Sequence, residues 1–410
     1  MRIYPLAASL LLICVPAASS QLAVQAEMLY TMTGDLKPLH DGVVLCSKDG
    51  RIERVGPRAE VGIPGGYRLL KAKVATPGFI DAHTTVGLSG ILNLDRHDQE
   101  QLETSAPIQP ELRAIDAYNG RDPLVQWIRE LGVTTIHTGH APGALVAGQT
   151  MILKTNISAI TDPGQNTLRP FAMVASTLGS AGFGKGGKSP GTRAKSLAML
   201  REHLLKAQRH LKKRNEVEEG EKPDPNLRLD AMAAVLEGKA PLLVTAKRHQ
   251  DIAAALRLQR EFNFPLILDG ASEAYLLLDE IKEARVPVII HPTMARPYGE
   301  NENITFTLAA KLYAAGIPFA FQSGYEAYVP KTRVVHFEAA LSVAYGLPHE
   351  VALAGCTSAA AEILGLEKRI GSLQPGLEAD LALFDGDPLE TVTHCTGVII
   401  DGKIVSRKTK

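Results

Sequence analysis

The central part of the chain alternates between short apolar runs and longer amphipathic segments, and this alternation limits the fold more than any other feature. Short runs of aliphatic and β-branched residues predict buried strands, while apolar residues three and four positions apart predict helices. The predicted strands are 77–82, 133–138, 150–155, 171–176, 241–246, 264–269, 286–291 and 317–322. The predicted helices are 123–131, 193–214, 250–262, 272–284, 304–315 and 331–344. Eight strands alternating with helices predict an α/β fold, a (β/α)8 TIM-type barrel with its functional site at the carboxyl ends of the strands.

One connection does not suit a regular barrel. Residues 139–149, between the second and third predicted strands, are too few for a connecting helix.

Both ends of the chain have a different pattern, with short alternating strands separated by Asp-Gly turns. Such turns are at Asp49-Gly50 and again at 385–386 and 401–402, and Asp-Gly favours tight hairpins. Neither end has enough apolar residues to bury a core alone. We therefore predict a small β-sandwich domain formed by both termini, residues 21–77 and 367–410, with the barrel spanning 78–366.

The first 20 residues resemble a cleaved secretory signal. Arg2 precedes an apolar run from Leu6 to Val15, and small residues follow up to Ser19 and Ser20. The apolar run is well short of the ~20 residues needed to cross a bilayer. We expect cleavage near Ser19 or Ser20 and a secreted or periplasmic protein.

Three cysteines remain after that cleavage: Cys46, Cys356 and Cys395. An odd number excludes a fully paired disulfide framework. A Cys46 to Cys395 bridge is one alternative, and buried free thiols are the favoured one.

The charge balance excludes one class of partner. Lys+Arg and Asp+Glu both number 44, so nothing in the net charge indicates nucleic acid. We expect a small-molecule substrate or ligand at the barrel mouth and no membrane association after signal cleavage. The sequence leaves the oligomeric state open.

A glycine-rich segment suggests nucleotide binding at first sight. GFGKGGKS, residues 182–189, matches the phosphate-loop pattern G-x-x-x-x-G-K-[ST]. A phosphate loop runs directly into a helix, whereas Pro190-Gly191 interrupts the chain after Ser189. NTP binding is therefore the least favoured alternative.

The stretch PGFIDAH, residues 77–83, resembles the first-strand motif of the amidohydrolase superfamily, in particular its imidazolonepropionase-like and dihydroorotase-like branch. GVTTIHTGHAPGALVAGQTMILKT and KRIGSLQPGLEADLALFDGDPLE are similar to later parts of that family. The resemblance implies a barrel that holds one or two divalent metals, commonly zinc, and hydrolyses non-peptide carbon–nitrogen bonds with metal-activated water.

Carried over residue by residue, the family's metal ligands are mostly replaced. The resemblance places these positions at His83, Thr85, Thr177, Thr245, Asp269 and Ser323, of which only His83 matches the family pattern. Threonine hydroxyls are poor ligands for zinc. The resemblance therefore implies a degenerate metal site, with no metal cofactor expected.

Other residues with metal-binding side chains lie at predicted strand ends. A relocated site for zinc or another divalent metal would use His83, His137, His140, Asp269 and His291. The alternative is that each makes ordinary hydrogen bonds. Two functions remain open: a divergent hydrolase of carbon–nitrogen bonds, and a catalytically silent relative that binds a small ligand or a protein through the old pocket.

Overall fold

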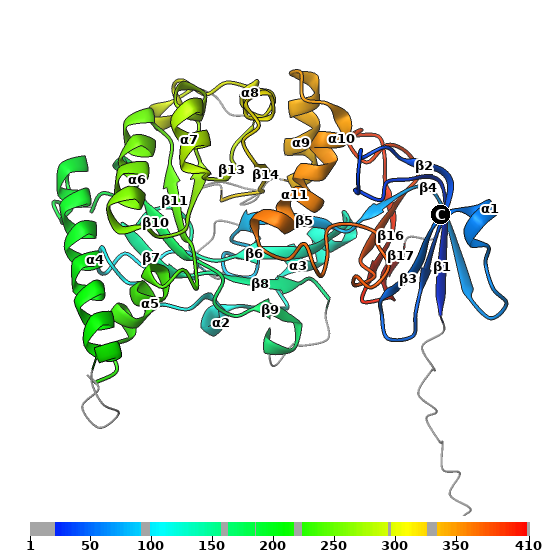
Figure 1. Ribbon diagram of the computed structural model, residues 1–410, viewed down its shortest axis with the longest axis horizontal. Coiled ribbons are helices and arrows are strands. Elements are labelled where there is room, and N and C mark those ends of the chain that lie inside the picture. The colour runs from blue at the N-terminus through cyan, green and yellow to red at the C-terminus, as the bar shows by residue number, and fades with distance from the viewer. Residues whose placement is uncertain are drawn as a thin grey trace, which may run out of the picture.

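The computed structural model describes residues 21–91, 99–156, 163–184, 186–216, 224–293, 297–325 and 334–407. The predicted signal segment, 1–20, lies outside these ranges. No helix within them is both long and apolar enough to cross a membrane. Figure 1 shows a larger part of strands and helices beside a smaller part made mainly of strands.

The smaller part is a seven-stranded sheet to which both ends of the chain contribute, in the order β17-β16-β15-β4-β1-β2-β3. Its strands are β1 (Leu22–Leu29), β2 (Leu39–Cys46), β3 (Ile52–Pro57), β4 (Arg68–Pro77), β15 (Leu381–Phe384), β16 (Cys395–Ile400) and β17 (Lys403–Arg407). A short helix, α1 (Arg58–Val61), follows β3. β4 pairs in parallel with β1 and antiparallel with β15. The central strand β4 therefore joins the two ends of the chain.

Two Asp-Gly turns also hold the ends together. Gly50 lies in the turn between β2 and β3, and Asp401-Gly402 form the turn between β16 and β17, all three with positive φ. A side chain at Gly50 would come within 2.4 Å of the Asp401 carbonyl oxygen, so glycine is needed there. Ala379 links the two turns, because its N–H donates to the Gly50 carbonyl and its carbonyl accepts from the Gly402 N–H.

The larger part contains two further sheets, with the orders β14-β13-β12-β11-β10-β7 and β5-β6-β8-β9. Their strands are β5 (Phe79–Thr84), β6 (Val133–Thr138), β7 (Val146–Gln149), β8 (Met151–Lys154), β9 (Thr167–Arg169), β10 (Val174–Thr177), β11 (Leu242–Ala246), β12 (Leu266–Gly270), β13 (Val288–Ile290) and β14 (Phe319–Phe321). All the predicted strands overlap an observed one. β10 to β14 run parallel to their neighbours, as do β5 and β6.

Helices lie along the outside of these sheets in Figure 1. They are α2 (Ala114–Ala117), α3 (Pro123–Glu130), α4 (Arg193–Glu216), α5 (Leu227–Leu236), α6 (His249–Phe262), α7 (Leu278–Ala284), α8 (Leu308–Ala315), α9 (Val335–Ala344), α10 (His349–Gly355) and α11 (Ser358–Ile363). The sequence pattern did not predict α2, α5, α10 and α11.

The third predicted strand departs from a regular α/β pattern. β8 pairs antiparallel with β6, and β7 pairs antiparallel with β10. The short segment 139–149 forms β7 and contains no helix. Because parallel neighbours need a long crossover, a connection this short leads to antiparallel pairing instead.

The two sheets adjoin at both edges. Thr84 of β5 forms a parallel bridge to Gly324, just after β14. At the other edge, the Thr150 N–H donates to the Met173 carbonyl, and the Ala172 N–H donates to the Thr150 carbonyl. One buried cluster draws a side chain from each of β5, β8, β11, β12, β13 and β14, among others: Ile80, Ile152, Leu243, Ile267, Ile289 and Ala320. The strands therefore enclose a shared apolar interior.

Cys46, Cys356 and Cys395 are buried free thiols, so the Cys46 to Cys395 bridge does not form.

Candidate functional site

Asp269, on β12, is the centre of a buried hydrogen-bond network at the carboxyl ends of the strands. Its Oδ1 contacts His83 Nδ1 of β5 at 3.0 Å and accepts a hydrogen bond from Gln322 Nε2 at 2.5 Å. Its Oδ2 accepts from the Thr245 hydroxyl of β11 at 2.5 Å. Thr245 and Asp269 are direct partners in the parallel ladder, so their side chains emerge side by side. Three of the six positions that the sequence resemblance assigns to metal ligands thus meet in one network. We call His83, Thr245, Asp269 and Gln322 the Asp269 network.

Charge and burial set the protonation of this network. Burial would raise the pKa of Asp269, but the His83 charge and the donated hydrogen bonds lower it to about 2. Burial would lower the pKa of His83, and the Asp269 carboxylate outweighs this effect and raises it. His83 is 3% exposed, and besides Asp269 it interacts with the backbone of His140, which also raises the pKa of His83. Asp269 therefore orients the His83 ring through Nδ1.

His137 lies near the end of β6, and His140 lies just after it. The two histidines differ in their hydrogen bonding. His137 donates from Nδ1 to the Ala82 carbonyl at 2.7 Å, and its Nε2 accepts from the Thr150 hydroxyl at 2.6 Å. Burial lowers the pKa of His137 to about 3. Both its nitrogens are used, so His137 holds neighbouring strands together. Burial lowers the pKa of His140 to about 4, and an interaction with the Leu112 backbone opposes this shift.

The remaining family positions serve the loops around the site. The Thr85 hydroxyl donates to Ser89 at 3.2 Å, and the Thr177 hydroxyl accepts from the Gly143 N–H at 3.2 Å. The Ser323 hydroxyl donates to Thr84 at 2.8 Å. These hydroxyls are all buried. Each one fixes a local turn or strand contact rather than joining the Asp269 network.

The side chains at the positions predicted for metal ligands, as the structure describes them, do not form a set that suits a metal ion. A catalytic zinc takes three protein ligands plus water, and Thr85, Thr177 and Thr245 offer only hydroxyls. The two strong donors, His83 and Asp269, bond to each other. Among the described residues, no group of three or more histidine, cysteine or acidic side chains is arranged to hold a metal. His291, after β13, packs its ring against Gly324, where a side chain would come within 2.5 Å of that ring.

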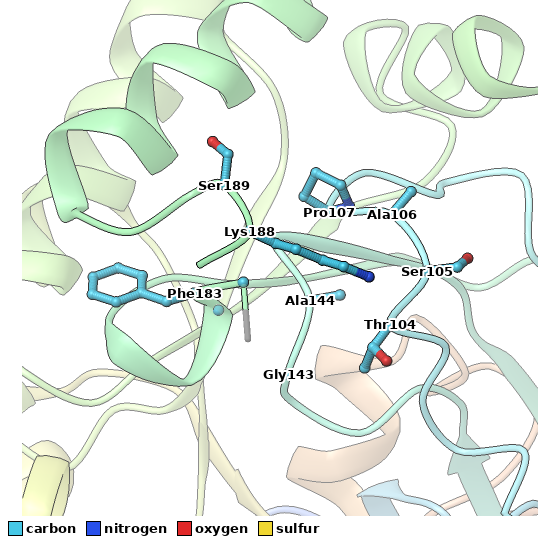
Figure 2. Close-up of a pocket in the computed structure, with 11 residues that line it drawn as sticks. Thr104, Ser105, Ala106, Pro107, Gly143, Ala144, Phe183, Lys188 and Ser189 are labelled. Atoms are coloured by element: carbon cyan, nitrogen blue, oxygen red, sulfur yellow. The ribbon is translucent and has the colours of Figure 1, made fainter. Parts of the chain in front are cut away.

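The GFGKGGKS segment lies at the same end of the strands but does not form a phosphate loop. After β10 the chain makes a short turn at 180–182, and α4 begins only at Arg193, beyond Pro190-Gly191. Residues of this segment line a cavity of about 90 Å³ together with residues 104–107, Gly143 and Ala144 (Figure 2). Pockets for drug-sized ligands usually exceed about 300 Å³, so a whole nucleotide does not fit.

Sequence reasoning missed Gln322 and Asp81. Gln322 is next to the expected position Ser323, and its side chain bonds to Asp269. Asp81 accepts from the Ser323 N–H at 2.9 Å, and burial raises the pKa of Asp81 to about 6. Asp81 lies two residues before His83 in the PGFIDAH motif, which was the available signal.

Comparison with known proteins points to one enzyme family. A model of the amidohydrolase family matches residues 344–406. The amidohydrolase tasK of Hapsidospora irregularis is 27% identical over 354 residues, which cover 80% of this chain. The matched region is only 36% of tasK, so this chain spans about a third of that relative's length.

Solved structures agree with this similarity. An amidohydrolase from Thermotoga maritima superimposes with a TM-score of 0.87 at 27% identity, covering 94% of this chain and 100% of that chain. An adenosine deaminase from Xanthomonas campestris with bound zinc has a TM-score of 0.56 at 16% identity, covering 94% of this chain and 92% of that one. The deaminase supports only a shared fold.

Proposed function

We propose that this chain is a member of the amidohydrolase superfamily and that it hydrolyses a non-peptide carbon–nitrogen bond in a small molecule without the family's metal centre. The observation that carries this proposal is the buried pair of His83 and Asp269, in which the carboxylate holds the imidazole by Nδ1. The imidazolonepropionase-like and dihydroorotase-like branch remains part of the proposal, since PGFIDAH carries that resemblance. A small amide, lactam or related ring is the substrate class it implies.

The His83–Asp269 pair supplies the proton transfers that such a hydrolysis requires. Asp269 holds the imidazole by Nδ1 and stabilises its charged form, as a carboxylate does for a catalytic histidine. His83 Nε2 takes a proton from the attacking water as the water oxygen bonds to the carbonyl carbon. His83 then returns the proton to the leaving nitrogen as the carbon–nitrogen bond breaks. One water is consumed, and the products are an acid and an amine.

This chemistry has a defined pH dependence. The first step needs neutral His83, and the Asp269 charge raises the pKa of His83 above its ordinary value of about 6.5. The rate should therefore rise with pH through the raised pKa of His83 and fall at lower pH, where the imidazole is already protonated.

A second candidate function is non-catalytic binding of a small ligand or protein through the same strand ends. The threonines at 85, 177 and 245 favour it, because they stand where the resemblance predicts the metal ligands that other family members use to activate water. The two candidates differ in turnover but not in fold.

The test is turnover of a panel of small amides, lactams and cyclic ureas by protein purified without chelators or affinity tags. We expect release of amine that persists in EDTA and falls about a hundredfold in His83→Gln, because general acid–base groups contribute roughly 10²–10⁴-fold. His249→Gln is the matched control: His249 lies at the start of α6, is 52% exposed, and bonds to Glu273 at 2.7 Å. Ligand binding with no turnover of any compound would instead support the second candidate.

Elemental analysis of the same protein checks the metal claim. We expect well below one zinc per chain. One zinc per chain that is lost in His291→Ala but kept in His249→Ala would contradict the proposal and restore the relocated site of His83, His137, His140, Asp269 and His291. Thr85→His alone should create no metal-dependent activity, because 177, 245 and 323 would still lack ligands.

We also infer that the two adjoining sheets form the (β/α)8 barrel of the superfamily, with residues 78–366 as the barrel and 21–77 and 367–410 as the second domain. The bridge between Thr84 and Gly324 and the shared apolar cluster support this inference. A crystal structure in which β5 and β14 are separated would contradict it.

Export is proposed on the sequence of residues 1–20. N-terminal sequencing of the mature protein should begin near Ser20. A mature protein that starts at Met1 or Arg2 would exclude cleavage of this segment.

A further inference from the structure

We propose that the cavity beside the GFGKGGKS segment binds the carboxylate end of a small anionic molecule through Lys188. The identity of this molecule as the substrate rests on the proposed function. The binding of an anion does not.

The glycines of the segment set the position of Lys188. The Gly184 N–H donates to the Pro190 carbonyl at 2.8 Å, which holds these two residues close together. A side chain at Gly184 would come within 2.5 Å of the Lys188 carbonyl oxygen, so only glycine permits this close approach. Gly186 and Gly187 both have positive φ, a conformation that glycine adopts without strain. The glycines therefore set the backbone path next to Lys188.

Among the described residues that line the cavity, Lys188 carries the positive charge, and its side chain is exposed to solvent. Figure 2 shows its side chain extending from the loop toward the segment that carries Ser105 and Ala106 on the other side. Thr104, Ser105 and Ser189 add hydroxyl groups to the lining, while Pro107, Ala144 and Phe183 add apolar surface. A lysine with nearby hydroxyls and an apolar wall suits a carboxylate attached to a short carbon chain.

The size of the cavity limits what it accepts. By the same measure of volume, one water needs about 10–15 Å³, so about 90 Å³ holds a few heavy atoms. One end of a small molecule fits, whereas a nucleoside triphosphate does not.

The cavity also lies next to the strand-end site. Its lining residue Gly143 donates to the Thr177 hydroxyl at 3.2 Å. A side chain at Gly182, another lining residue, would come within 2.3 Å of the Thr177 carbonyl oxygen. Thr177 pairs with Thr245 of the Asp269 network in the parallel ladder, so the cavity lies one strand away from the residues to which the proposed reaction is assigned.

One acidic residue competes for Lys188. Glu103 precedes the lining segment, and its carboxylate accepts from the Ser105 N–H at 2.6 Å. That hydrogen bond lowers the pKa of Glu103, with a smaller contribution from the Lys188 charge. An incoming carboxylate must therefore displace part of this attraction, and removing the Glu103 charge should strengthen anion binding.

The test compares N-acetylglycine with its neutral amide, N-acetylglycinamide, by isothermal titration calorimetry on the full chain. We expect N-acetylglycine to bind about tenfold more tightly. Its carboxylate can form a charge-assisted hydrogen bond with Lys188, which the neutral amide cannot form, and partial solvation of Lys188 limits the gain. Lys188→Met should remove that preference, and Glu103→Gln should tighten N-acetylglycine binding about threefold. Lys195→Met, an exposed lysine on α4 outside the cavity, should change nothing.

Equal affinity for the two probes in the unaltered protein would overturn the anion site, as would a preference that survives Lys188→Met. Charge-selective binding with no hydrolysis of any substrate would support the site and count against the proposed function. Hydrolysis of a substrate by a protein that binds the two probes equally would support the proposed function and contradict the anion site. Circular dichroism of each variant establishes that it is folded before its binding is compared.

Discussion

Lys154→Met is expected to lower the free energy of unfolding by about 3–5 kcal/mol, the usual cost of leaving buried charges without their partner. Lys154, on β8, is 3% exposed and contacts Glu378 at 2.7 Å and Asp380 at 3.1 Å, as well as Asp401 in the turn between β16 and β17. Its ammonium therefore joins the larger part of the protein to the C-terminal strands. Urea denaturation at pH 7 measures the loss.

The control for this variant is Lys206→Met. Lys206, on α4, contacts Glu202 at 2.6 Å, but both side chains are more than half exposed. Exposed pairs of this kind are screened by solvent and contribute little, so the loss should be much smaller than that of Lys154→Met. A Lys154→Met effect no larger than that of the control would show that the buried cluster does not stabilise the fold.

The loss should depend on pH. Burial raises the pKa of Asp380 to about 6 although Lys154 opposes the shift, so protonation of Asp380 stabilises the fold as the pH falls through 6. Without Lys154 this pKa rises further, and the variant gains more from acidification than the unaltered protein. The difference in unfolding free energy between the unaltered protein and Lys154→Met should therefore be smaller at pH 5 than at pH 7. Adding Asp380→Asn to the variant should recover part of the loss at pH 7, because it removes one of the unpaired charges.

Much of the fold follows from local patterns in the sequence. Buried parallel strands such as β11 and β12 are continuous apolar runs, and each is followed by a turn and then a helix, so period and length suffice to predict them. The Asp401-Gly402 turn was also predictable from local sequence, because Asp-Gly is one of the few residue pairs that adopt positive φ readily. Two antiparallel pairings, of β7 with β10 and of β8 with β6, were not predicted. They depend on which neighbouring strand a short connection can reach.

The site was harder to predict than the fold. His83, Thr245 and Asp269 are far apart in the sequence, and the family resemblance identified their positions without showing that they bond to one another. His137 looked like a metal ligand, but both of its nitrogens are used by Ala82 and Thr150, which no spacing rule reveals. Single-sequence patterns identify which strand end carries a residue, whereas hydrogen-bond partners across strands depend on side-chain positions in three dimensions.

Deleting residues 370–410 is expected to leave no folded protein. The deletion removes β15, β16 and β17, and it exposes the edge of β4 that pairs with β15. An unpaired central strand is a template for aggregation. The expected result is insoluble protein or a chain without a cooperative unfolding transition, measured by soluble yield, limited proteolysis and thermal denaturation. Deleting only 408–410, which keeps all three strands, is the control.

The reason is that the deleted strands contribute to both parts of the protein. Leu381, Leu383 and Ile399 are buried in the cluster that contains the N-terminal strands, and each such side chain contributes about 1.5–3 kcal/mol. Phe384 packs against Phe79 of β5, with ring centroids 5.6 Å apart, so the larger part loses contacts as well. The deletion also removes all three carboxylates around Lys154. Because the total stability of a domain is about 5–15 kcal/mol, these losses together exceed what the remaining chain can tolerate. A soluble truncated protein that unfolds in one cooperative transition would show that the N-terminal strands do not need the C-terminal ones.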